Sequence, residues 1–165
     1  VDILSNLDFN KFYGADRKVV CLSCGVPHEM AGATLLVSWR KTKRYLIFNR
    51  QQRLVGWVNI EMRQIKSCYE EVRALEPEIQ EGDVIDILHR HHLSAFAFSG
   101  IHTFSPKLFP LMKDYPDKFP IMDFYLQNAD RVAIKGIVDD SLRLLDVGKL
   151  DTLDQAESFL IKYGC

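Results

Sequence analysis

Glycine-rich loops are missing from this sequence. The nine glycines among its 165 residues are scattered, and no two of them form a G-x-G pattern. Backbone N–H groups of glycine-rich loops cradle phosphates, so the sequence carries no phosphate-binding loop of that kind. No Ser-His-Asp or Cys-His arrangement stands out either. We therefore expect no chemistry that depends on a side-chain nucleophile.

Long apolar runs and a charge imbalance are absent as well. No apolar run approaches the roughly 20 residues that cross a bilayer, no signal peptide is visible, and the formal net charge is −1. We expect no membrane span, and nothing in the charge favours nucleic acid as a partner. Hydrophobic residues make up 47% and charged residues 26%, as in ordinary soluble domains. These features predict one cytoplasmic domain over residues 1–165.

Cysteine is sparse, with four in the chain. A domain of this size has an ample core and needs no disulfides, so we expect reduced thiols. Cys21 and Cys24 form a C-x-x-C pattern with His28 four residues on, which leaves metal or redox use open. A structural zinc site needs a second ligand pair, and only scattered candidates exist. The alternative, a pair of unmetallated thiols, is the one we favour.

Short apolar segments alternate with helix signals along the chain. We expect strands at 33–39, 44–49, 53–58, 92–104, 132–138 and 142–145, with the second and third forming a hairpin. Helices are expected after Ser105 and Pro106, over 119–129 and from near Asp151. The acidic stretch 69–86 is expected to be a solvated connector or a short helix. Strands alternating with helices predict an α/β fold.

Two aspartates stand near the two ends of the chain. Asp2 lies in the run VDILSNLD, and Asp146 lies in RLLDVGKLD. Each is expected at the carboxyl end of a strand, where ligands bind in open α/β sheets. Two carboxylates at such an edge suit Mg²⁺ bound to phosphate oxygens. The alternative for a single aspartate at a strand end is a turn or helix cap.

Four stretches in order resemble the nucleoside-diphosphate-sugar pyrophosphorylases, the sugar-1-phosphate nucleotidyltransferase family. These are VDILSNLD, AFSGIHTFSPKLF, FPIMDFYLQNA and RLLDVGKLDTLDQAE. The resemblance covers nearly the whole chain. Its most specific parts are the SGI strand before an SP-initiated helix and the DVG turn before the last helix. It implies a Rossmann-like three-layer α/β/α fold.

The resemblance also implies an activity and a site. The family forms an NDP-sugar and pyrophosphate from an NTP and a sugar-1-phosphate, with Mg²⁺. Its two metal-binding acids correspond to Asp2 and Asp146 by resemblance. Phe98, Ser99 and Gly100 match the strand that lies against the sugar. Phosphoryl-group transfer of this kind depends on positioning and charge neutralisation.

The sequence departs from the family in two places. The glycine-rich basic loop near the family's N-terminus has no counterpart, and the chain begins at Val1 rather than Met. We therefore expect the C-terminal portion of a longer domain, inactive by itself, with its N-terminal nucleotide-binding part missing. The family's Glu-Lys pair is absent from 54–59. Trp57 in that segment is a candidate for stacking on a sugar, with core packing as the alternative.

Weaker candidates surround these positions. Lys149, after the DVG turn, reaches a phosphate or lies exposed at a helix start. The basic run 40–44 holds phosphate or forms a solvated hairpin loop. His89, His91 and His92 are poorly placed for one metal if they lie on a strand. Asp8 is expected to cap a helix rather than assist Asp2, and His102 faces the site or is an ordinary strand histidine.

Two rival functions remain at this stage. The first rival is a non-catalytic module that binds sugar nucleotides or takes part in assembly. The second is a small metal or redox domain built on Cys21 and Cys24. We also expect an exposed strand edge at residues 1–4, which invites self-association.

Overall fold

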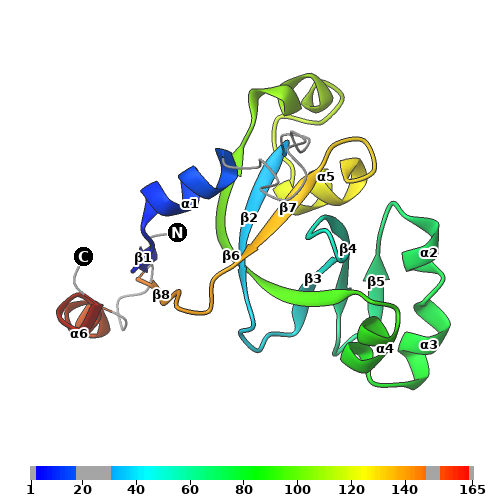
Figure 1. The fold of residues 1–165 in the computed structure, drawn as a ribbon, viewed down its shortest axis with the longest axis horizontal. Helices are drawn as coiled ribbons and strands as arrows, with labels where there is room; N and C mark the ends of the chain where they lie inside the picture. Colours follow the sequence, from blue (N-terminus) through cyan, green and yellow to red (C-terminus); the bar gives the residue numbers. More distant parts are fainter. Residues whose placement is uncertain (1–2, 18–30, 148–152, 164–165) are drawn as a thin grey trace, which may run out of the picture.

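The computed structural model describes residues 3–17, 31–147 and 153–163. Its centre is a six-stranded mixed sheet in the order β5-β4-β3-β6-β2-β7 (Figure 1). The β2 and β7 pair is parallel, and the other neighbours are antiparallel. The strands are β2 (Ala33–Ser38), β3 (Arg44–Phe48), β4 (Leu54–Asn59), β5 (Gln64–Lys66), β6 (Ser94–Phe104) and β7 (Ile134–Val138). The predicted α/β class is confirmed at this level.

Strand β3 shows how the sheet is buried on both faces. Leu46 and Phe48 pack into one core cluster, and Ile47 between them packs into a second. Successive strand residues point to opposite faces, so one strand contributes to both clusters. The expected hairpin with β4 is confirmed, since Arg44 pairs with Asn59 and Leu46 with Trp57.

Helices cover the two faces. One cluster receives residues of η1 (Pro106–Met112) and α5 (Ile121–Asn128), among them Leu108 and Phe124. The other receives residues of α2 (Glu70–Arg73), α3 (Glu76–Glu81) and α4 (Val84–Arg90). Figure 1 shows these three helices gathered beside β5. The helix predicted after Ser105 is present as a 3-10 helix, and Ser105 accepts a hydrogen bond from the Lys107 amide.

The acidic stretch 69–86 is not a solvated connector. It forms α2, α3 and the start of α4, and its apolar residues close the second core. Ile79 is fully buried, and Val72 and Leu75 are nearly so. The acids alternate with these residues at helical spacing, which keeps the carboxylates at the surface while the apolar side chains pack on the sheet.

Gly100 lies where the pairing of β6 with β2 is interrupted. Leu35 pairs with His102 and Val37 with Phe98, so three β6 residues stand opposite Leu36 alone. Gly100 has φ of 85°, a conformation that only glycine adopts readily. The resulting β-bulge lies within β6 at Ser99 and Gly100, two of the residues that the resemblance places against the sugar.

A second, two-stranded sheet joins β1 (Ile3–Ser5) to β8 (Leu144–Asp146). Figure 1 shows this pair set apart from the main sheet. Helix α1 (Phe9–Arg17) follows β1, and Asp8 caps it by accepting from the Asn10 and Lys11 amides at 2.9 and 3.0 Å. The capping role expected for Asp8 is therefore confirmed. Helix α6 (Leu153–Tyr163) is the last element.

Asp2 was expected at the carboxyl end of a strand, and it lies outside the described residues; the described part of the neighbouring strand β1 is Ile3–Ser5. Asp146 does end β8, as predicted. Within the described ranges, no helix is long and apolar enough to cross a membrane.

Candidate functional site

The main candidate site is a cavity of about 490 Å³ on the α5 side of the sheet. Strands β3, β4 and β6 supply one wall and the first turns of α5 supply another. Its lining residues are Arg40, Thr42, Arg44, Tyr45, Leu46, Trp57, Lys66, Phe98, Met122, Asp123 and Leu126. The set combines cations, aromatic rings and a single carboxylate.

Three cationic side chains face this cavity: Arg40, Arg44 and Lys66. They come from the turn after β2, the start of β3 and the end of β5. Arg40 is held in place because its guanidinium donates to the Phe98 carbonyl at 3.3 Å. Asp123 contributes the one negative charge, so the wall has two positive charges in excess. A dianionic phosphate monoester has the charge that matches this excess.

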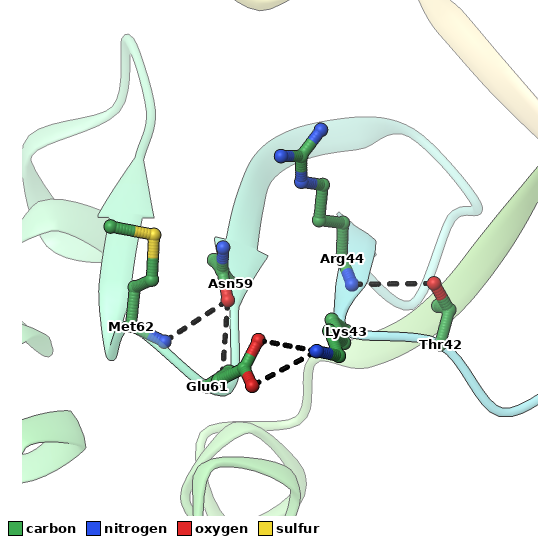
Figure 2. Close-up of polar contacts among 6 residues, drawn as sticks. All are labelled: Thr42, Lys43, Arg44, Asn59, Glu61 and Met62. Carbon is green, nitrogen blue, oxygen red and sulfur yellow. Dashed lines mark hydrogen bonds and ion pairs between the residues drawn. The ribbon is translucent and has the colours of Figure 1, made fainter.

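The basic run 40–44 divides into two parts. Lys43 forms an ion pair with Glu61 at 2.9 Å, while the Arg44 side chain points away from that pair (Figure 2). Within the described part of the chain, no carboxylate pairs with Arg44. The Arg44 amide donates to the Thr42 hydroxyl at 3.4 Å, and the Asn59 side chain caps the turn that holds Glu61. The run therefore offers Arg44, rather than Lys43, to a ligand.

Three aromatic residues, Tyr45, Trp57 and Phe98, line the same cavity. Trp57 is half-buried against the first core cluster, and the Lys66 ammonium lies 5.4 Å from the centre of its ring. The core-packing alternative for Trp57 is therefore confirmed. Because the ring also borders the cavity, stacking on a sugar stays a prediction. An aromatic face beside hydrogen-bonding groups suits the apolar face of a sugar.

Lys66 has a second partner in Asp123, with Nζ 4.0 Å from Oδ1. Asp123 lies in the first turn of α5. The two side chains also border a neighbouring cavity of about 430 Å³, which is lined by Lys66, Ser67, Cys68, Asp123, Leu126 and Gln127. Burial raises the pKa of the Cys68 thiol in this second cavity, and the thiol stays protonated at neutral pH.

Ser99 and Gly100 do not line either cavity. Ser99 is buried, and its hydroxyl donates to the Leu36 carbonyl at 2.7 Å. That carbonyl stands at the β-bulge, where β6 offers no regular backbone partner. Of the three strand residues assigned to the sugar, Phe98 alone faces the cavity, while Ser99 and Gly100 shape the strand.

The two candidate metal ligands fall at the edge of the described residues. Asp146 stands directly opposite Ile3 in the β1–β8 pair, and Ile3 follows Asp2 in the sequence. Asp2, Lys149, Cys21, Cys24 and His28 lie outside the described residues, as does the Asp146 side chain. Among described side chains, no group of three or more His, Cys, Asp or Glu is placed to hold a metal.

The contacts of His102 and His91 are with other side chains of the fold. His102 is half-buried, and its Nδ1 lies 3.0 Å from the Tyr125 hydroxyl. Burial lowers the pKa of His102 from its usual 6.5 and raises that of Tyr125. His89 belongs to α4 rather than a strand, and His91 contacts Glu78 at 3.0 Å. The strand placement assumed for His89, His91 and His92 was therefore wrong, since His91 and His92 form the turn after α4.

Sequence reasoning missed Lys66 and Asp123. Asp123 lies in one of the four stretches that carry the resemblance, but as a single charged residue it was assigned no role, and Lys66 lies in no motif. The two residues are 57 positions apart in the sequence. Lys66 joins the site because β5 pairs with β4 at the sheet edge, which brings Lys66 opposite Trp57. No local sequence pattern predicts this pairing.

Comparison with known proteins adds no assignment. A scan against protein-family models found no match to this chain, and a search of curated proteins found none either.

Proposed function

We propose that this chain is the C-terminal portion of a Rossmann-like sugar-1-phosphate nucleotidyltransferase domain. The cavity between Arg44, Lys66 and Trp57 carries the proposal, because it joins cations to aromatic walls. In this proposal the sugar's phosphate lies against Arg40, Arg44 and Lys66, and its ring lies against Trp57 and Phe98. The intact protein forms an NDP-sugar and pyrophosphate from an NTP and this substrate.

The chain's residues act by binding and orienting the sugar phosphate. Two arginines offer paired N–H donors that match phosphate oxygens, and Lys66 adds a single charge. Holding the phosphate fixes the oxygen that attacks the α-phosphorus of the NTP, and such positioning is a large part of catalysis in phosphoryl-group transfer. No described side chain has to act as a covalent nucleophile.

Magnesium is the metal that the proposed function requires. Carboxylate oxygens are the donors that Mg²⁺ prefers, and Asp146 ends β8 directly opposite the residue after Asp2. The chemistry of this donor set is compatible with Mg²⁺. Asp2 and Asp146 would hold it, and the ion would neutralise charge on the phosphates.

A binding titration tests the proposal with a matched pair of variants. Isothermal titration calorimetry with α-D-glucose 1-phosphate is compared for the parent chain, Arg44→Ala and Lys43→Ala. We expect Arg44→Ala to weaken binding about tenfold or more, since it removes a charge-assisted contact. Lys43→Ala should leave binding unchanged because Lys43 is paired with Glu61. Equal losses in both variants, or no binding to the parent chain, would contradict the proposal.

A further inference from the structure

The ion pair between Lys66 and Asp123 stands between two cavities. Both residues line the main cavity and also the neighbouring one, and Leu126 of α5 is shared in the same way. Asp123, Leu126 and Gln127 lie on one face of α5 at helical spacing. The two cavities therefore follow α5 side by side, and the ion pair divides them.

This divider is weak. Nζ and Oδ1 are 4.0 Å apart, and the side chains of Lys66 and Asp123 are 59% and 48% exposed. Exposed ion pairs contribute little stability because water screens the charges. A phosphate in the main cavity offers Lys66 a doubly charged partner, so ligand binding draws Lys66 away from Asp123.

Asp123 then faces the second cavity without its cation. Its side chain is 48% exposed, so water solvates it there, and a ligand that displaces this water has to supply a hydrogen-bond donor in its place. Gln127 on the same face already uses its carbonyl oxygen, which accepts from the Tyr115 hydroxyl at 2.6 Å. Its amide N–H group is the part of the side chain that can donate to a ligand's acceptor. The second cavity thus offers one acceptor and one donor to whatever enters it.

We propose that the second cavity is a subsite for a hydroxyl- or amide-bearing substituent of the sugar phosphate. The substituent donates a hydrogen bond to Asp123 in place of Lys66, and Asp123 thereby acts as a specificity-determining residue. This proposal rests on the proposed function, since a phosphate in the main cavity is what draws Lys66 away. An amide or hydroxyl suits both Asp123 and Gln127, because each group donates and accepts.

Opposite responses of two ligands test this proposal. Calorimetry measures the binding of N-acetyl-α-D-glucosamine 1-phosphate and of inorganic phosphate to the parent chain and Asp123→Asn. We expect the variant to bind the sugar phosphate about tenfold more weakly, because the charged acceptor is lost. Inorganic phosphate should bind equally well or more tightly, because Lys66 no longer has a competing carboxylate.

Asp117→Asn is the matched control. It removes the same charge from an exposed position before α5 and outside both cavities, and it should change neither affinity. If Asp123→Asn weakens both ligands equally or alters neither, the subsite proposal is wrong. If the parent chain binds no sugar phosphate at all, the proposed function fails first. If Arg44→Ala weakens binding of the sugar phosphate and Asp123→Asn does not, the subsite proposal is wrong and the proposed function stands.

The Cys68 thiol supplies a second readout because it lines the second cavity. Its alkylation by iodoacetamide is followed by peptide mass spectrometry, which separates Cys68 from the other three cysteines. We expect N-acetyl-α-D-glucosamine 1-phosphate to slow this alkylation several-fold, roughly in proportion to occupancy, and inorganic phosphate to leave it unchanged. Equal protection by both ligands, or protection by neither, contradicts occupation of the second cavity by the substituent.

Discussion

The Tyr125 hydroxyl lies 3.0 Å from Nδ1 of His102, and this contact joins α5 to β6. The rings also meet edge to face, with centroids 5.6 Å apart. Tyr125 is fully buried, and its neighbours on α5, Asp123 and Leu126, line the candidate site. The contact therefore holds in place the helix on which both cavities depend.

Protonation of His102 should destabilise the fold. Burial lowers its pKa below 6.5 in the folded chain, so the unfolded chain binds the proton at higher pH. This contribution to stability is present above pH 6.5 and is lost as the pH falls from there toward the lowered pKa. We expect urea unfolding to show a larger loss of stability between pH 7.5 and pH 5 for the parent chain than for His102→Gln. Identical losses of stability in the parent chain and in His102→Gln would show that His102 is not the group responsible.

Ser99 should matter for stability and not for binding. Ser99→Ala leaves the Leu36 carbonyl without its hydrogen bond at the β-bulge, and we expect a loss of about 1–2 kcal/mol in the free energy of unfolding. The affinity for α-D-glucose 1-phosphate should not change, because Ser99 is buried away from both cavities. Weaker binding at unchanged stability would make Ser99 a ligand-contacting residue after all.

Asp146 should be needed for divalent metal. Titration with Mn²⁺, followed by electron paramagnetic resonance as a substitute for Mg²⁺, is expected to show about tenfold or greater weakening in Asp146→Asn, because a carboxylate ligand is lost. Asp114→Asn removes an exposed charge outside both cavities and serves as the control. If both variants bind Mn²⁺ like the parent chain, Asp146 is not a metal ligand.

The chain by itself should not release pyrophosphate from NTP and sugar-1-phosphate mixtures. Its sequence has no glycine-rich basic loop, and such loops supply the backbone donors that hold a triphosphate. Losing even one preorganised donor costs about 10²–10³ in rate. A coupled pyrophosphate assay with several substrate pairs checks this. Turnover would place the triphosphate site within these residues. Binding of the sugar-1-phosphate without turnover would distinguish a fragment of an enzyme from a chain that binds no substrate.

Local patterns in the sequence were enough to predict most elements. The hairpin of β3 and β4, the long strand β6 with Gly100, and the helix start at Ser105 follow from alternation, glycine conformation and capping, which act between residues close in sequence. For the acidic stretch 69–86 the short-helix alternative is confirmed. The solvated-connector alternative was wrong because it weighted the charges over the apolar residues between the acids. Ile79 and its neighbours bury only because the sheet face beside them needs cover.

The composition of the site was decided by tertiary structure. Sequence alone indicated Trp57 and Phe98 as separate candidates, and nothing local related them to Lys66 or Asp123. Pairing of β5 with β4 sets Lys66 opposite Trp57, and packing of α5 on the sheet brings Asp123 within 4.0 Å of Lys66. The pairing of β6 with β2 likewise decides the role of Ser99, whose hydroxyl donates to the Leu36 carbonyl at the β-bulge. Strand order and helix docking are long-range properties, since they depend on which apolar faces bury one another rather than on any single segment's pattern.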